Sequence, residues 1–168
     1  MQKGSFKLPF LLVLTVNSFS AGLLNAGRCV ELHTLQLGKG VEARARGGVG
    51  LIFTGGMTPN PEGGVFPGAA GLYSAQDIAN HRIVTDRVHA AGGRIAMQIL
   101  HAGRYAYSKD CVSASPVKSP ISPFPPKELD EDGIEKQISD IVTAAARARE
   151  AGYDGVEVMG SEGYFLNQ

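Results

Sequence analysis

The sequence has few cysteines, no excess of either charge and no long apolar run. Its two cysteines, Cys29 and Cys111, lie far apart and form no CxxC pair. We therefore expect neither a disulfide framework nor a metal site of the zinc type, and reduced thiols are typical of a cytoplasmic protein. The 16 acidic and 16 basic residues cancel, so the composition lacks the basic excess of a nucleic-acid-binding protein.

The first 42 residues are the least regular part of the chain. Lys3 and Lys7 precede an apolar run over residues 8–16, and small residues follow, which outlines a signal peptide over residues 1–21. The run is too short to cross a membrane as a helix. A buried strand and a non-native leader are the alternatives. We expect residues 1–42 to be an irregular leader on a cytoplasmic protein that has no membrane partner.

Glycine is abundant, with 22 residues, and it first marks a structural unit at residues 43–56. A helix end and a glycine turn precede the short apolar run of residues 49–53, which predicts a strand covered on both faces. Gly55 and Gly56 follow Thr54 and allow a ligand to approach the backbone closely. A plain turn between strand and helix is the alternative.

A second unit runs from residue 57 to residue 101. A long irregular loop, of the kind that is uncommon unless functional or disordered, leads to Ser74 and Asp77, which resemble a capping box at a helix start. The glycine pair at residues 92–93 ends that helix, and residues 94–101 predict the next strand.

Gln98 places an amide inside this apolar strand. A buried amide needs hydrogen-bond partners, either neighbouring backbone or a flat ligand with several heteroatoms, such as a flavin. His101 and Arg104 follow at the strand exit and suggest an anion or aromatic site, with solvated loop residues as the alternative.

The last third of the chain predicts an irregular proline-rich excursion, a long helix and a third strand. The helix starts at Asp130 or Asp132, and Gly152 stands where a helix C-cap glycine belongs. Its apolar residues recur at three and four residues as an amphipathic stripe: Ile134, Ile138, Ile141, Val142, Ala145 and Ala148. Glu162 and Tyr164 then follow directly after the carboxyl end of the strand that contains Met159.

Strand, helix, strand, helix and strand in this order predict an α/β fold with about three parallel strands and right-handed crossovers. A doubly wound sheet and a TIM barrel both fit the order. A barrel would gather the three strand exits on one face, where barrel enzymes carry their active sites.

Three stretches of the sequence carry a resemblance to a known family: residues 45–56, residues 98–105 and residues 148–164. Over residues 43–168 the chain resembles the N-terminal barrel of bacterial-type 2,4-dienoyl-CoA reductases, which belong to the old yellow enzyme or NADH:flavin oxidoreductase family. The resemblance implies a partial TIM (β/α)8 barrel that binds FMN. It does not extend to residues 1–42.

The resemblance also implies roles for individual residues. Gly55 would lie against the flavin and Gln98 would hydrogen-bond its ring. Tyr164 would be the proton donor, and Glu162 would tune or position it. Met159 and Glu162 stand where many ene-reductases of the family carry His and Asn or His, which favours the dienoyl-CoA branch; His101, Arg104 and Met159 would lie near the flavin or the substrate.

The implied reaction is the reduction of conjugated C=C bonds in enoyl or dienoyl thioesters of coenzyme A, as in fatty acid β-oxidation. Such enzymes also use FAD, a 4Fe-4S cluster and NADPH through regions that this chain does not resemble. Three strands of a barrel leave open sheet edges, so we expect the chain alone to be marginally stable, to bind FMN weakly and to be inactive without the remaining strands. A truncated inactive gene product and another ene-reductase of the family are the alternatives.

Overall fold

A computed structural model of the chain describes residues 11–15 and 30–168. Its helices are α1 (Val30–Arg46), α2 (Ala75–Ala90) and α3 (Glu131–Glu150). Its strands are β1 (Leu11–Thr15), β2 (Ile52–Phe53), β3 (Ile95–Ile99), β4 (Val112–Ser113), β5 (Lys127–Glu128) and β6 (Gly155–Met159). Short 3₁₀ turns cover Pro61–Gly63, Gly103–Tyr105 and Phe165–Asn167. Most of the signal-like N-terminal stretch lies outside the described residues.

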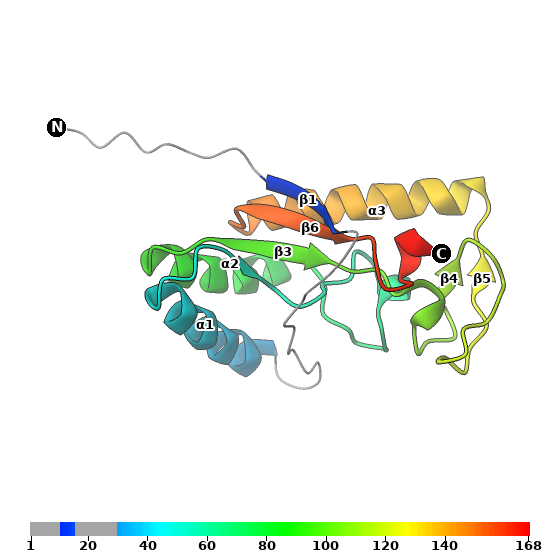
Figure 1. The fold of residues 1–168 in the computed structure, drawn as a ribbon, viewed down its shortest axis with the longest axis horizontal. Coiled ribbons are helices and arrows are strands. Elements are labelled where there is room, and N and C mark those ends of the chain that lie inside the picture. Colours follow the sequence, from blue (N-terminus) through cyan, green and yellow to red (C-terminus); the bar gives the residue numbers. More distant parts are fainter. Residues whose placement is uncertain (1–10, 16–29) are drawn as a thin grey trace.

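The main sheet has four parallel strands in the order β1-β6-β3-β2 (Figure 1). The predicted α/β class with parallel strands is confirmed, and the sheet contains one strand more than the three that the sequence indicated. The added strand is β1, which pairs with β6 from Leu11 opposite Gly155 to Thr15 opposite Met159. Residues 11–15, inside the run of residues 8–16, therefore form a strand, as one of the alternatives held.

The helices pack side by side, with α2 between α1 and α3, and α3 lies along β3 and β6. One apolar core joins residues of all three helices to β2, β3 and β6; its fully buried members include Val88, Ile95, Ala148 and Val156. Within the described residues, no helix combines the length and the apolar character needed to cross a membrane.

Local sequence signals place the helix ends correctly. The hydroxyl of Ser74 accepts a hydrogen bond from the backbone N–H of Asp77, and the Asp77 carboxylate accepts one from the backbone N–H of Ser74, which completes the predicted capping box. Asp130 caps α3 through the backbone N–H of Gly133. Gly152 follows α3 with a φ of 88°, in the left-handed region where glycine is favoured.

One prediction about which face of an element is buried is wrong, and a second is wrong in part. Phe53 in β2 is 42% exposed, so this strand is not covered on both sides; β2 is an edge strand and only Ile52 faces the core. In α3 the stripe members Ile134, Ile138 and Val142 are exposed, whereas Ala148 is buried as predicted. Gln137 and Ala144, outside the stripe, are buried as well. The close approach of α3 to the sheet leaves room mainly for alanine. The predicted division of the chain after residue 42 stays a prediction, and α1 runs across it.

Candidate active site

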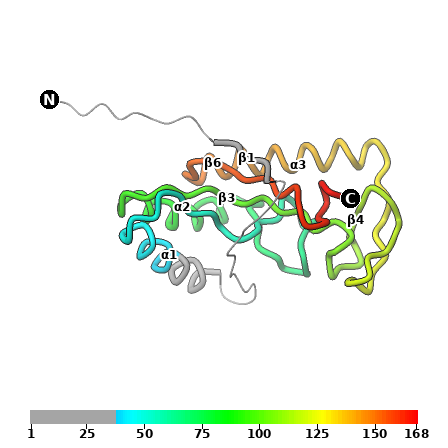
Figure 2. Tube along the Cα trace, in the orientation of Figure 1, coloured from blue at the N-terminus to red at the C-terminus, as the bar shows by residue number. Residues whose placement is uncertain are grey.

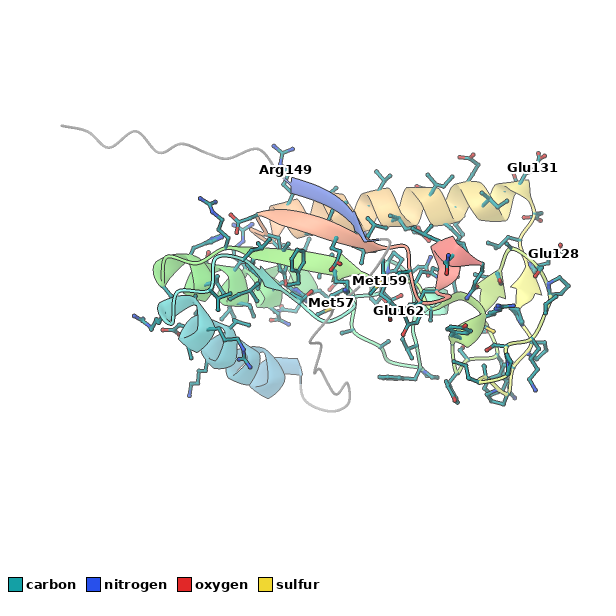
Figure 3. The ribbon with its side chains drawn as sticks, viewed as in Figure 1. Met57, Glu128, Glu131, Arg149, Met159 and Glu162 are labelled. Atoms are coloured by element: carbon teal, nitrogen blue, oxygen red, sulfur yellow. The ribbon has the colours of Figure 1, made fainter. Side chains whose placement is uncertain are left out.

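Three strand exits meet at one edge of the sheet. Because β2, β3 and β6 are parallel neighbours, their carboxyl ends point the same way. Gly55 follows β2, His101 and Arg104 follow β3, and Glu162 and Tyr164 follow β6. Figure 3 shows Met159 and Glu162 at the exit of β6. The fold therefore directs the predicted site residues to a common edge, as a barrel does.

Gln98 is held by a buried carboxylate on the neighbouring strand. Gln98 and Glu157 are register partners in β3 and β6, and Gln98 Nε2 donates to Glu157 Oε2 over 2.9 Å. An ionised carboxylate can only accept, so this bond fixes which end of the amide faces Glu157. Among the described residues, no hydrogen bond engages the amide oxygen of Gln98. Sequence reasoning missed Glu157, although a carboxylate inside an apolar strand is the same signal that singled out Gln98.

The exit of β2 is tied to β3 on both sides of Gly55. The Thr54 hydroxyl accepts from the backbone N–H of Gln98 over 3.0 Å, and the backbone N–H of Met57 donates to the Gln98 carbonyl over 2.8 Å. A Cβ at Gly56 would lie 2.7 Å from Leu100 Cβ, so this glycine allows close packing of the two exits. The nearness of Gly55 to a flavin stays a prediction.

His101 is bonded within the protein through both ring nitrogens. The backbone N–H of Gly103 donates to Nδ1 over 3.0 Å, which leaves the proton on Nε2, 3.1 Å from Gln137 Oε1. The ring packs on Phe165 with centroids 4.1 Å apart. Burial lowers the pKa of His101 to about 4, with the Gln137 bond acting in the opposite direction, so the ring is neutral at neutral pH. His101 thus supports the segment that carries Tyr164.

Gln137 stands at the centre of a polar network between α3 and the loop after β2. Its oxygen accepts from Asn60 Nδ2 over 2.6 Å, and its Nε2 donates to Glu62 Oε1 over 2.6 Å. Lys136 Nζ lies 2.7 Å from both Glu62 and Asp140. Burial raises the pKa of Glu62, but the bonds from Lys136 and Gln137 outweigh it, so the net shift is downward. Nothing in the sequence pattern of α3 marked Gln137, because its partners come from distant segments.

Tyr164 lies half-buried at the start of the last 3₁₀ turn. Its ring meets the edge of Tyr105, with centroids 5.8 Å apart and planes at 71°. Burial first, and then the negative charge of Glu162, raise the pKa of Tyr164, so its phenol keeps its proton at neutral pH. Glu162 adopts a φ of 62°, which is uncommon for a residue other than glycine and is found at functional turns.

Met159 and Ser161 line the same exit. Both side chains are buried, and Ser161 Oγ donates to Met159 Sδ over 3.3 Å. A thioether has no hydrogen to donate, so position 159 cannot hold a carbonyl oxygen by donating to it. The phenol of Tyr164 at the same exit carries a proton at neutral pH.

Arg104 is half-buried in the short 3₁₀ turn Gly103–Tyr105 that follows β3. Its guanidinium carbon lies 5.9 Å from the centroid of the Tyr105 ring, and its backbone N–H donates to Gln168 Oε1 over 3.0 Å. Figure 2 shows the C-terminal segment folded back against the part of the chain that follows β3.

The residues at this edge fit a flavin. The oriented amide of Gln98 offers an acceptor to the heteroatom edge of a flat ring, and the glycine pair at residues 55–56 allows close approach of the backbone. No group of three or more His, Cys, Asp or Glu residues that could hold a metal ion occurs in the described part of the chain.

Comparison with known proteins agrees with this geometry. Residues 36–168 match the NADH:flavin oxidoreductase / NADH oxidase family. The chain is 38% identical over 139 residues to a "Metal reductase" of Desulforamulus reducens, covering 80% of this chain and 21% of that protein. It is 33% identical over 127 residues to an "NADPH dehydrogenase" of Halalkalibacterium halodurans, covering 76% of this chain and 38% of that protein.

Solved structures of old yellow enzymes have the same fold. Morphinone reductase superposes with a TM-score of 0.71 at 27% identity, over 79% of this chain and 41% of that one. A crystal structure described as TcOYE with pHBA gives a TM-score of 0.70 at 28% identity, over 80% of this chain and 43% of that one. The chain thus spans well under half the length of these relatives, and it belongs to the NADH:flavin oxidoreductase / NADH oxidase family, which includes the old yellow enzymes.

Proposed function

We propose that this chain forms the part of an FMN-dependent, NAD(P)H-driven reductase that positions the flavin ring and supplies the proton for reduction of a conjugated C=C bond. The observation that carries the proposal is the half-buried, protonated Tyr164 at the exit of β6, beside a Met159 that has no hydrogen to donate. The relatives named NADPH dehydrogenase and morphinone reductase support the reaction class.

Tyr164 would protonate one carbon of the double bond as the other receives a hydride. Reduced FMN, when bound, supplies that hydride. A phenol with a raised pKa keeps its proton until negative charge develops on the substrate, which is the condition for general acid catalysis. Gln98, oriented by Glu157, would hydrogen-bond the flavin ring at this edge of the sheet.

The substrate class that we propose is an enoyl or dienoyl thioester of coenzyme A. The support is the pair Met159 and Glu162, which replaces the hydrogen-bond donors that other ene-reductases of the family carry. The runner-up is a different ene-reductase of the same family. FAD, a 4Fe-4S cluster and NADPH bound through further regions belong to the same proposal.

The first test is a chimera in which the matched 127 residues of this chain replace the equivalent part of the Halalkalibacterium halodurans enzyme. We expect the chimera to bind FMN and to reduce a 2,4-dienoyl thioester with NADPH. The 168-residue chain alone should bind FMN weakly. A chimera that binds FMN and reduces simple enones, but leaves the thioester untouched, would support the runner-up instead.

Tyr164→Phe in this chimera should slow substrate reduction by roughly 100-fold or more, because the proton donor is lost. Reduction of the bound flavin by NADPH should not change, since it needs no proton from Tyr164. Tyr107→Phe, at an exposed tyrosine in the loop after β3, is the matched control. Stopped-flow measurement of the two half-reactions separates the effects, and unchanged substrate reduction in Tyr164→Phe would remove Tyr164 as the acid.

A further inference from the structure

Arg104 lies at the same edge of the sheet as Tyr164, and within the described residues its side chain contacts the Tyr105 ring but forms no ion pair. Its Nε is buried and has no hydrogen-bond partner within the described residues. The rest of the half-buried side chain is only partly withdrawn from water, and the buried Nε–H loses hydration that a surface arginine keeps. Such a group is stabilised when an acceptor reaches it.

The structure ties Arg104 to the Tyr164 segment in two ways. The Tyr105 ring contacts both, since it lies 5.9 Å from the Arg104 guanidinium carbon and 5.8 Å from the Tyr164 ring centroid. Gln168 links the backbones: its Oε1 accepts from the N–H of Arg104 over 3.0 Å, and its Nε2 donates to the Gly163 carbonyl over 2.6 Å. Arg104 therefore belongs to a segment that packs against the segment carrying Tyr164.

Other ionisable side chains near this edge are neutral, already paired or negatively charged. His101 is neutral at neutral pH and its two ring nitrogens are bonded to Gly103 and Gln137. Lys136 is occupied by Glu62 and Asp140. The exposed Glu162 is negative, and its charge adds to burial in raising the pKa of the Tyr164 phenol.

We propose that Arg104 binds an oxyanion, a carboxylate or a phosphate, of the small-molecule ligand that occupies the site beside Tyr164. The planar guanidinium fork matches two oxygens of such a group. The inference rests on the proposed function only for the identity of the ligand: a coenzyme A thioester brings phosphates to the site, whereas another substrate could bring a carboxylate.

The test follows the side-chain Nε–H signals of arginine by NMR in the ¹⁵N-labelled 168-residue chain, without flavin. The Arg104 signal is assigned as the one that Arg104→Lys removes. Inorganic phosphate and acetate are titrated separately, with sodium chloride at the same ionic strength as the reference. We expect the Arg104 signal and the Gly163 amide to shift with saturation, while the signal of the exposed Arg149 follows the chloride reference.

The outcomes test whether Arg104 binds an oxyanion and identify whether that oxyanion is a phosphate or a carboxylate. Tighter binding of phosphate assigns the oxyanion to a phosphate-bearing ligand, and tighter binding of acetate assigns it to a carboxylate. Arg104→Gln should weaken the saturable Gly163 shift by about tenfold or more, the value of one charge-assisted hydrogen bond. Shifts that are equal in chloride, or common to all arginines, overturn the inference. Because no flavin is present, failure of FMN binding would contradict the proposed function alone.

Discussion

Gly63 shows how a single residue sets the position of His101. Its carbonyl accepts from the backbone N–H of Ala102 over 2.8 Å, and its N–H donates to Asn60 Oδ1 over 2.8 Å. A Cβ added at Gly63 would lie 2.5 Å from His101 Cδ2, closer than side chains approach one another. The loop after β2 can therefore lie against the histidine ring only if residue 63 has no side chain.

Gly63→Ala should destabilise the chain by about 1–3 kcal/mol, because the buried ring cannot move away without breaking its bonds to Gly103 and Gln137. Gly50→Ala is the matched control, since a Cβ there meets no atom within 4 Å. Urea unfolding followed by circular dichroism measures both variants. Equal free energies of unfolding for the two variants would contradict the close approach.

At the scale of elements, α3 combines an apolar outer stripe with a polar contact to the rest of the site. Ile134, Ile138 and Val142 are 47%, 51% and 63% exposed. The buried Gln137, one residue from Ile138, instead bonds Asn60, Glu62 and His101 from two other parts of the chain. The helix thus fixes the exits of β2 and β3 relative to each other through one amide.

Gln137→Leu should lower the free energy of unfolding by about 1–3 kcal/mol. Asn60 keeps a bond to Asp140 and Glu62 keeps one to Lys136, but the Nε2–H of His101 loses its acceptor inside the protein. Gln76→Leu, at an exposed helical glutamine in α2, should stay within about 0.5 kcal/mol of the wild type.

The same pair of variants can be compared by NMR. In Gln137→Leu the ring of His101 should lose its fixed Nε2–H tautomer, which ¹⁵N shifts of the imidazole report. A loss of stability with an unchanged tautomer would mean that Gly103 alone orients the ring.

At the scale of the whole molecule, the buried His101 and the half-buried His81 are both uncharged at neutral pH. Burial lowers the pKa of His81 to about 4, partly offset by the charge of Asp77, and His81 Nδ1 lies 2.7 Å from the hydroxyl of Tyr153. His101 is shifted to the same value. In the unfolded chain both would titrate near the ordinary histidine pKa of about 6.5.

Stability should therefore fall as the pH drops from about 6.5 to about 4. In this window the unfolded chain binds more protons than the folded one, so the free energy of unfolding rises with pH, by up to roughly 1.4 kcal/mol per pH unit for each histidine. Urea midpoints at pH 7, 6 and 5 measure the slope. His81→Phe should reduce it by about half, and a slope that His81→Phe leaves unchanged would contradict the assignment.

The carboxylates of the network around Gln137 affect the free energy of unfolding at lower pH than the histidines do. Burial raises the pKa values of Glu62 and Asp140, but their bonds to Lys136 outweigh it and the net shifts are downward. Their contribution to stability is present above the ordinary carboxylate pKa and is lost as the pH falls through the lowered values. Acid unfolding should thus continue below the histidine window.

Short-range patterns were sufficient for the helix ends, for β3 and for β6. The capping box of Ser74 and Asp77 and the cap of Asp130 need only residues three positions apart. The apolar run of β3 is buried along its whole length, as its composition predicted. Tyr164 and Gln98 were likewise visible as polar residues at or inside strands, because such positions stand out against apolar neighbours.

Tertiary packing decided which face of each helix and strand is buried and which distant residues become hydrogen-bond partners. The stripe of Ile134, Ile138 and Val142 predicts a buried face from periodicity alone, yet the sheet lies against the alanines, because burial depends on which neighbour covers a face. Glu157 orients Gln98 and Gln137 binds His101 across 59 and 36 positions of the chain. A hydrogen bond requires two groups within about 3 Å, and only the folded arrangement of distant segments brings these pairs that close.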